Sequence, residues 1–337
     1  MKDILHFEDF AEGQSFDCGE RTLTEEEMIA FARRYDPLPF HVDREAARAS
    51  LLGGLAASGW HTCALMMRMY AEAVILRTAG LGSPGVSEVR WRKPVYANVP
   101  MRLRCDVTGS RPSGSRPDAG LVSFEFTLSA PEHILCTQSF VVLIARRSPG
   151  GASSARAVAK KASLPEKAPE RIAPGSEMTY VDPADAPVGV AFDLGSEEIT
   201  AEAIVDFAQQ FDPQPFHLDR EAGRASLFGG LAASGWHTTA VWMGRMSAAH
   251  QAAMATLPAE EQTNAQVKRG PSPGFEDLRW RRPVLEGDTL RCFSMPLEVR
   301  DLNSMRDWGL LLMRNWAENQ RGEIAMSFTG KLLLRRG

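Results

Sequence analysis

At 337 residues, the chain is long enough for two domains of ordinary size, each with a buried core. Its 44% hydrophobic and 24% charged residues are close to the averages of soluble globular proteins. A formal net charge of −4 gives no whole-chain reason to expect nucleic acid. We therefore expect a small-molecule substrate, without a nucleic-acid partner and without membrane association.

The five cysteines are odd in number and scattered, without the CxxC or His-rich spacing of a zinc site. This pattern favours a reducing compartment and no structural metal. The N-terminal residues lack the apolar core of a signal peptide, and no run of ~20 apolar residues occurs in the chain. We expect a cytoplasmic protein.

In chain order, the dominant feature is a stretch that occurs twice, at 31–61 and 207–237, with 24 identities in 31 positions. This match has an offset of 176 residues, whereas the later Trp-Arg-Lys-Pro-Val at 91–95 matches 280–284 at an offset of 189. The second copy therefore holds 13 extra residues, which we place within 250–272. One unit has been duplicated, and its surface loops have diverged.

The first predicted helix of each copy ends just before an Asp-Pro-x-Pro segment. Thr24 followed by Glu27 forms a capping-box pattern, and the apolar positions predict a short helix that ends near Arg34. The second copy pairs Thr200 with Ala203, so its cap is expected to be weaker. Proline lacks the N–H that a helix needs, so the Asp-Pro-x-Pro segments are predicted to be loops.

Next in the chain, Asp43 and Asp219 have the positions of N-caps of short helices, followed by a Gly-Gly turn. From Ser58 and Ser234 the chain is mostly apolar for about four to five turns, which predicts a long buried helix in each copy. Alternating and β-branched runs then predict strands without intervening helices, hence an antiparallel sheet. The predicted strands are 85–96, 100–108, 120–130 and 134–145, then 274–285, 289–300, 308–318 and 322–335.

These elements predict an N-terminal domain at 1–147 and a C-terminal domain at 176–337. Between them, 148–175 is rich in Ala, Pro, Gly, Ser and Lys and poor in aromatic residues, which is typical of a flexible linker. The predicted fold class is α+β, with a long helix packed on an antiparallel sheet in each half.

Each repeated loop carries a carboxylate and an imidazole: Asp36 with His41, and Asp212 with His217. Such a pair can hold one water molecule and move a proton to or from a substrate. The alternative interpretation is an Asp-capped turn beside a structural histidine. Gly59 and Gly235, at the starts of the long helices, offer backbone N–H groups to an oxygen that gains negative charge. Tight packing of helix on sheet is the alternative role of these glycines.

The order of these motifs resembles the MaoC-like dehydratases, which include the R-specific enoyl-CoA hydratases (hydratase 2). The resemblance rests on Asp-x-x-Pro-x-His, an Asp-led short helix, Gly-Gly-Leu-Ala-Ala-Ser-Gly before a long helix, and Arg-Arg-Pro-Val-Leu-Glu-Gly-Asp-Thr-Leu at 281–290. It implies a tandem (double) hot-dog fold, in which each central helix is wrapped by an antiparallel sheet and the halves pack as a pseudo-dimer. A homo-oligomer of the whole chain stays open.

The resemblance also implies the reaction. In that family the matched Asp and His position a water for syn addition to a trans-2-enoyl-CoA thioester, and the helix-start amide polarises the carbonyl. No metal or redox cofactor is implied. By this correspondence the catalytic residues are Asp212, His217 and Gly235, with Asp36, His41 and Gly59 as a second set.

The two copies depart from the family pattern, which has Gly before the Asp and Asn two residues after it. Tyr35 and Leu38 occupy these positions in the first copy, and Phe211 and Gln214 in the second. Gln214 can donate and accept hydrogen bonds, whereas Leu38 can do neither. The first half also has Asn-Val-Pro at 98–100 where the second has Gly-Asp-Thr at 287–289. Both differences favour the second copy.

Other residues have weaker signals. Gln214, Arg279 and Arg281 are candidates for substrate binding, the arginines through CoA phosphates, although alternation along a strand also fits ordinary outward charges. His61 and His237 fall one turn into the long helices and are expected to pack rather than react. Two alternative functions are a non-catalytic acyl-thioester-binding or scaffolding protein and, with less support, a hot-dog thioesterase.

Overall fold

The computed structural model describes residues 4–148 and 168–337. Its N-terminal unit contains, in order, β1 (Ser15–Arg21), α1 (Glu25–Tyr35), α2 (Pro39–Val42), α3 (Arg44–Ala49), α4 (Gly59–Ala73), β2 (Gly80–Trp91), β3 (Met101–Pro112), β4 (Ala119–Ala130) and β5 (His133–Ala145). The C-terminal unit contains β6 (Arg171–Pro174), β7 (Val190–Glu198), α5 (Ala201–Phe211), α6 (Pro215–Leu218), α7 (Arg220–Ala225), α8 (Gly235–Ala255), α9 (Ala259–Lys268), β8 (Gly274–Trp280), β9 (Thr289–Asp301), β10 (Trp308–Glu318) and β11 (Ile324–Arg335).

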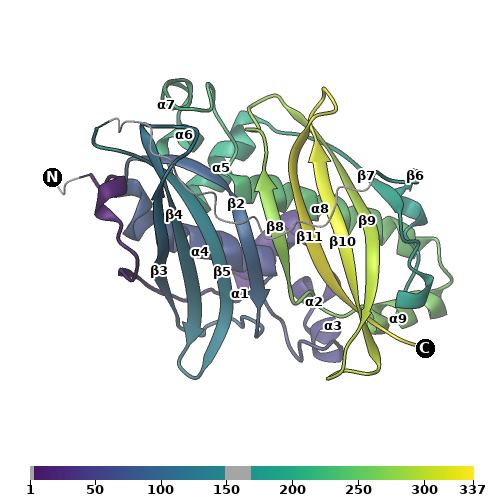
Figure 1. Ribbon diagram of the computed structural model, residues 1–337. Helices are drawn as coiled ribbons and strands as arrows, with labels where there is room; N and C mark the ends of the chain where they lie inside the picture. Colours follow the sequence, from purple (N-terminus) through teal and green to yellow (C-terminus); the bar gives the residue numbers. More distant parts are fainter. Residues whose placement is uncertain (1–3, 149–167) are drawn as a thin grey trace.

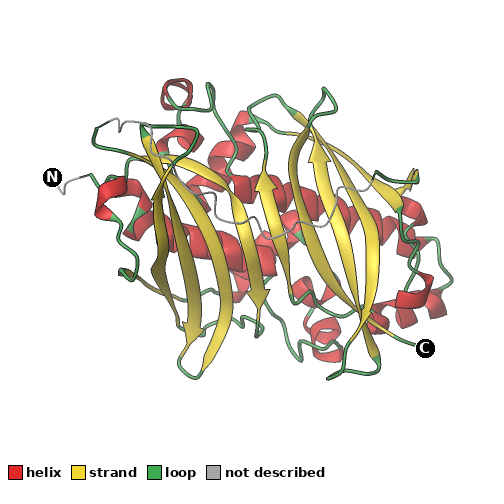
Figure 2. Ribbon diagram, viewed as in Figure 1, coloured by secondary structure: helices red, strands yellow, loops and turns green. Residues whose placement is uncertain are grey.

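The strands of both units form one continuous sheet, in the order β1-β3-β4-β5-β2-β8-β11-β10-β9-β7-β6. Neighbouring strands are antiparallel, except that β6 pairs with β7 in parallel. The two units meet where β2 pairs with β8, and the long helices α4 and α8 lie behind the sheet (Figures 1 and 2). The chain thus has the predicted α+β, double hot-dog architecture, with the two halves packed as an intrachain pseudo-dimer.

One hydrophobic core cluster extends through both units. Met66 and Tyr70 of α4 belong to it and are 1% exposed, and so are Phe275 and Leu278 of β8. The helices are apolar nearly all round because they are covered by their own sheet and by the opposite unit. The halves therefore stabilise each other through shared burial of apolar surface.

Most predicted elements are confirmed. Thr24 and Glu27 form the capping box of α1, whereas Thr200 caps α5 without the reciprocal bond. Asp43 and Asp219 accept hydrogen bonds from backbone N–H groups as N-caps. The extra residues of the second copy lie where predicted, in the longer α8 and in α9.

Four predictions of local structure need correction. The strands predicted at 85–96 and 274–285 end earlier, at Trp91 and Trp280. The second proline of each Asp-Pro-x-Pro segment starts a helical turn, α2 or α6, because proline at the first helical position loses no hydrogen bond. Strands β1 and β7 were not predicted, since each is bent by a glycine with positive φ, Gly19 or Gly195. Most of the predicted linker lies outside the described residues, and its end forms the edge strand β6. Among the described residues, no helix combines the length and apolar character needed to cross a membrane.

Candidate active site

The loop after α1 brings Asp36 and His41 together. The Asp36 N–H donates to the Ala32 carbonyl and ends the helix, and the turn α2 then carries His41 back toward the carboxylate. The His41 Nε2 atom lies 3.5 Å from Asp36 Oδ2, and its Nδ1 atom lies 2.8 Å from the Ala56 carbonyl oxygen. Both side chains are buried, with residue exposures of 3% for Asp36 and 7% for His41.

These contacts determine the tautomer of a neutral His41. The Ala56 carbonyl can only accept a hydrogen bond, so Nδ1 carries the proton and Nε2 is an acceptor. At 3.5 Å, the contact between Nε2 and the carboxylate is too long for a good direct hydrogen bond. Both atoms are therefore acceptors that can take a hydrogen bond from a water molecule entering the cavity beside them.

The second copy has the same arrangement. The His217 Nε2 atom lies 3.4 Å from Asp212 Oδ2, and Nδ1 lies 2.6 Å from the Ala232 carbonyl oxygen. Asp212 and His217 are 3% and 5% exposed. The fold therefore brings together both predicted Asp–His pairs.

The serine before each long helix holds the carboxylate. Ser58 Oγ donates to Asp36 Oδ2 at 2.6 Å, and Ser234 Oγ donates to Asp212 Oδ2 at the same distance. The same hydroxyl oxygens accept the backbone N–H of Trp60 or Trp236 as helix caps. The sequence predicted these serines only as helix starts. The signal that could have linked them to the aspartates is their position, 22 residues after the aspartate in both copies of the repeat.

The other carboxylate oxygen has a different partner in each copy. Gln214 Nε2 donates to Asp212 Oδ1 at 2.9 Å. Leu38 cannot replace it, but Ser247 Oγ, from helix α8 of the opposite unit, lies 3.3 Å from Asp36 Oδ1. Both carboxylates thus have two side-chain donors. Burial by itself raises the pKa of Asp212, but His217, Ser234 and Gln214 outweigh it and lower that pKa below its usual value.

Gly59 and Gly235 fulfil a packing requirement and also border the site. A Cβ atom on Gly59 would lie 2.4 Å from the Trp91 ring, and one on Gly235 would lie 2.3 Å from the Trp280 ring. Any side chain there would displace a tryptophan, so the packing interpretation is correct. Both glycines are half-buried and line a cavity beside the Asp–His pair, so the predicted role of their N–H groups is compatible with this packing.

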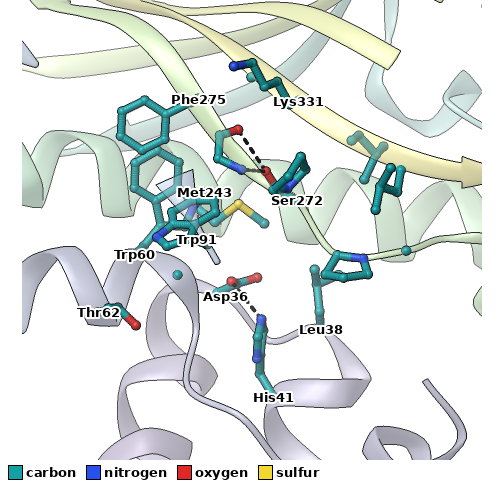
Figure 3. A pocket seen from close by; sticks show the side chains of 18 of the residues that line it. Asp36, Leu38, His41, Trp60, Thr62, Trp91, Met243, Ser272, Phe275 and Lys331 are labelled. Carbon is teal, nitrogen blue, oxygen red and sulfur yellow. Dashed lines mark hydrogen bonds and ion pairs between the residues drawn. The ribbon is translucent and has the colours of Figure 1, made fainter. Parts of the chain in front are cut away.

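Each pair opens on a cavity that both units line. The Asp36–His41 cavity has a volume of about 330 Å³ and the Asp212–His217 cavity about 170 Å³. In the larger one, Asp36 and His41 point toward each other, and the rings of Trp60 and Phe275 stack beside them at 4.9 Å (Figure 3). Met243 of the opposite unit completes this part of the wall.

The interiors of the two units explain the difference in volume. In the first unit four aromatic side chains pack together: Tyr70, Phe124, Phe126 and Phe140. The repeat and the strand register place Met246, Met313, Asn315 and Gly330 at the corresponding positions of the second unit. These smaller side chains line the Asp36–His41 cavity, so the Asp–His loop of the first unit faces the open interior of the second.

The smaller cavity is narrowed further near its histidine. The Phe228 ring lies 6.2 Å from the His217 ring and nearly parallel to it, where the first copy has Leu52. The N-terminal unit contributes Phe140 and Gly82 to the lining of this cavity. Aromatic bulk therefore occupies space that is open in the larger cavity.

The model of the family described as the MaoC like domain matches residues 9–122 and 185–306, in both halves of the chain. The chain belongs to this family. Its membership supports a hydratase or dehydratase kind of function, and the two matched segments coincide with the two units that each carry an Asp–His pair.

Solved structures at low sequence identity share the fold of this chain. A MaoC domain protein from Chloroflexus aurantiacus superposes with a TM-score of 0.78 at 17% identity, covering 100% of this chain and 99% of that one. A conserved hypothetical protein from Mycobacterium tuberculosis, described as having a double hotdog fold, gives 0.68 at 16%, covering 98% of each. The uncharacterized protein YdeM of Bacillus subtilis is 24% identical over 119 residues, which are 35% of this chain and 83% of YdeM.

The predicted substrate-binding residues of this MaoC-like chain lie in different places. Gln214 and Arg281 line the smaller cavity, and Arg281 Nε donates to Ser327 Oγ at 3.2 Å. Arg279 lines neither cavity, because its guanidinium pairs with Asp277 at 2.6 Å. His61 and His237 stack on Phe rings of the first helices, and burial lowers the pKa of each to about 3.

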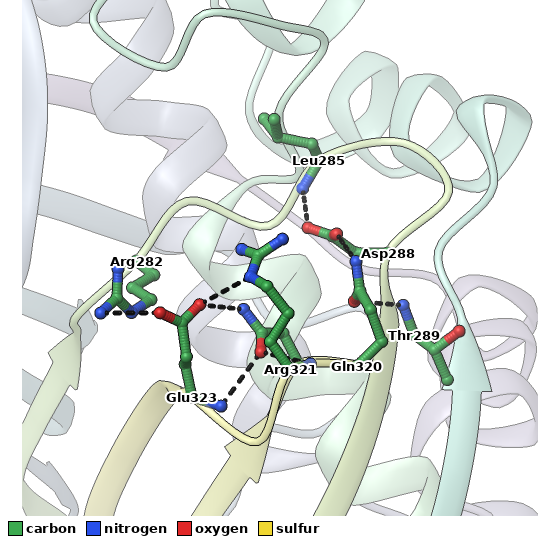
Figure 4. A network of polar contacts seen from close by, with 8 residues as sticks. Arg282, Leu285, Asp288, Thr289, Gln320, Arg321 and Glu323 are labelled. Carbon is green, nitrogen blue, oxygen red and sulfur yellow. Dashed lines mark hydrogen bonds and ion pairs between the residues drawn. The ribbon is translucent and has the colours of Figure 1, made fainter.

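The Gly-Asp-Thr sequence at 287–289 has a structural role. The Asp288 carboxylate accepts hydrogen bonds from the Leu285 N–H at 2.8 Å and from Gln320 Nε2 at 2.7 Å (Figure 4). Beside it, Arg282 pairs with Glu323 at 3.1 Å. This network joins the β8–β9 turn to the β10–β11 hairpin, and Asp288 lines neither cavity. In the described part of the chain, no group of three or more His, Cys, Asp or Glu side chains is arranged to hold a metal ion.

Proposed function

We propose that this protein is an acyl-CoA hydratase or dehydratase and that the Asp36–His41 pair is its principal catalytic site. The observation that carries the proposal is the larger cavity, which extends from this pair into the open interior of the second unit. An acyl chain needs such a mostly apolar space with a few convergent polar groups.

The reaction is a syn addition of water to a trans-2-enoyl thioester. A water held between Asp36 and His41 Nε2 forms its C–O bond at C3 and loses one proton to the pair. The electrons of the double bond move toward the thioester carbonyl, whose oxygen gains negative charge beside the Gly59 N–H. The pair then delivers a proton to C2, so that one water molecule is added in total.

Sequence and geometry favour different copies. Gln214 favours the Asp212–His217 pair, whereas the cavity favours Asp36–His41, whose carboxylate gains Ser247 where Leu38 offers no hydrogen bond. Four single substitutions separate the two sites: Asp36→Asn, His41→Ala, Asp212→Asn and His217→Ala. The readout is loss of the conjugated thioester absorbance of a trans-2-enoyl-CoA.

We expect Asp36→Asn and His41→Ala to lower kcat by about 10²- to 10⁴-fold, the usual contribution of general acid–base catalysis. The matched variants Asp212→Asn and His217→Ala serve as controls and should keep most of the activity. The reverse pattern would assign the reaction to the second copy, and full activity with all four residues changed would exclude this mechanism. Tight binding of CoA thioesters without turnover would instead support a binding protein, and release of free thiol a thioesterase.

A further inference from the structure

The larger cavity is lined by four cationic side chains in three different settings. Arg92 and Lys93 are exposed to solvent at its rim. Lys331 is held between two glutamates of the central strands, 3.2 Å from Glu276 and 4.0 Å from Glu88. These three charges are balanced by water or by carboxylates. The fourth cation is Arg269.

Arg269 is half-buried and follows helix α9. Among the described residues, no carboxylate lies within 4.0 Å of its guanidinium, whose hydrogen-bond partner is His250 Nδ1 at 3.3 Å. Burial lowers the pKa of His250 well below its usual value. An imidazole is not an anion, so this contact does not neutralise the guanidinium as an ion pair would. Burial likewise lowers the pKa of Arg269, and Tyr180 and Asp36 act in the opposite direction.

A charge withdrawn from water without a paired anion is costly, and it is stabilised when an anion enters beside it. Arg269 and the Asp36–His41 pair line the same cavity, whose volume is about 330 Å³. An acyl chain that starts at the pair and fills this cavity can therefore place its far end beside Arg269.

This cation belongs to one copy only. Arg269 pairs with Leu334 of β11 as Gly80 pairs with Ile144 of β5, so Arg269 corresponds to Gly80, and the smaller cavity has no counterpart of this charge. The larger cavity also contains a buried polar pair, in which Ser294 Oγ donates to Asn315 Oδ1 at 2.7 Å. The corresponding residues of the first unit are Cys105 and Phe126. A plain alkyl chain would pair with none of these groups.

We propose that the larger cavity accepts a short acyl chain whose far end is a carboxylate, and that this carboxylate pairs with Arg269. The substrate class is thus the monothioester of a dicarboxylic acid. The inference rests on the proposed function for the position of the thioester, but binding alone can test it.

The phosphates of coenzyme A are a second source of negative charge. Phosphates that remain in water would contact the exposed side chains of Arg92 and Lys93. Arg269 is less exposed than these two residues, and burial lowers its pKa. The experiment separates the two sources because both ligands in each comparison carry the same coenzyme A.

Binding of saturated thioesters is measured by calorimetry with glutaryl-CoA and pentanoyl-CoA, which differ by a terminal carboxylate. The wild-type protein should prefer glutaryl-CoA by roughly 10- to 100-fold, the usual effect of a hydrogen bond to a charged group. Arg269→Gln should abolish this preference, and Arg269→Lys should keep part of it. The control Arg300→Gln, which removes an exposed arginine paired with Glu298, should not change it.

No preference in the wild-type protein would overturn the inference. So would equal losses for both ligands in Arg269→Gln, which would show that Arg269 meets coenzyme A. Truncated N-acetylcysteamine thioesters of the same two acids carry no phosphate, and persistence of the preference with them supports the acyl carboxylate.

Turnover distinguishes this inference from the proposed function. With glutaconyl-CoA and trans-2-pentenoyl-CoA, Arg269→Gln should lose hydration of the first by roughly 10- to 100-fold and retain the second, which also shows that the variant is folded. A binding preference without hydration of either thioester would reject the proposed reaction and support the carboxylate site. Equal hydration of both by wild type and variant would support the reaction and reject the carboxylate site.

Discussion

The two halves keep the same Asp–His loop but use the space behind their sheets differently. The first half fills its interior with Tyr70 and three phenylalanines, and the second leaves its interior open around Met246 and Gly330. Because each Asp–His loop faces the interior of the opposite half, the filled half carries the roomier cavity. In a fused pair, the capacity of one site therefore depends on side chains of the other half.

Among the variants that test this comparison of the two interiors, the largest expected effect comes from filling the open interior of the second half. Replacing Met246 by Tyr and Met313 by Phe copies the first half, and the added bulk should shorten the Asp36–His41 cavity. We expect kcat/KM for longer enoyl-CoA chains to fall by about 10- to 100-fold relative to crotonyl-CoA, because pockets discriminate strongly by size. A chain-length series measured by loss of enoyl absorbance checks this prediction.

The matched control makes the converse change, Phe140→Leu, which enlarges the smaller cavity. If the reaction occurs at Asp36–His41, this variant should keep the wild-type chain-length profile, although removing buried ring atoms destabilises the fold. A profile that shifts toward longer chains in Phe140→Leu would move the reaction to the second copy.

The sequence predicted the shared features of the halves better than their differences. The caps at Thr24 and Asp43, the long helices and the Asp–His pairs depend on local residue patterns, so they were visible in the repeat. Leu38 led to the prediction that the first Asp–His pair is less active than the second, because Leu38 offers no hydrogen bond to Asp36 within its own loop. Ser247 contacts Asp36 across 211 residues, and no local pattern reveals such a contact.

One signal could have indicated the asymmetry. Aligning the two copies sets Ser247 against Ala71 and Met246 against Tyr70, within helices that are otherwise apolar. The hydroxyl of Ser247 and the smaller side chain of Met246 indicate that this part of α8 does more than pack in the core. Recognising their target still requires the pairing of β2 with β8, which decides which loop faces which interior.

His61 of α4 and His237 of α8 are buried at equivalent positions, so comparing them shows whether the two halves also differ outside the cavities. Burial lowers the pKa of His61 and His237 to about 3 from the ordinary 6.5, and the Nδ1 atom of each has no partner among the described residues. Between these values the unfolded chain binds a proton that the folded chain does not. Stability therefore falls as the pH falls from 6.5 toward 3, by up to about 1.4 kcal/mol per pH unit for each histidine.

Urea unfolding across this pH range should show a flatter acid slope for His61→Gln and for His237→Gln, by similar amounts. Replacing the exposed His133 by Gln is the control and should leave the slope unchanged. Different slopes for the two buried positions would show that the divergence extends beyond the cavities.

The smallest expected effect concerns the donor that each half supplies to its carboxylate. Ser247 reaches Asp36 from the opposite half, whereas Gln214 reaches Asp212 from its own loop. Ser247 is thus a positioning residue for Asp36. Loss of one neutral-donor hydrogen bond costs about 0.5–1.5 kcal/mol, so Ser247→Ala should lower kcat by roughly 2- to 10-fold and leave KM unchanged.

The matched variant Gln214→Leu removes the corresponding donor from Asp212 and copies Leu38 of the first loop. If Asp36 is the catalytic carboxylate, Gln214→Leu leaves kcat unchanged, even though both variants remove a donor to a buried carboxylate and should lower the unfolding midpoint similarly. Equal kcat values in wild type and Ser247→Ala would show that the contact only packs α8 against the first loop. A lower kcat in Gln214→Leu, with an unchanged kcat in Ser247→Ala, would place catalysis at the second loop. A purely structural loss would instead lower the unfolding midpoint of both variants and would not lower kcat in only one of them.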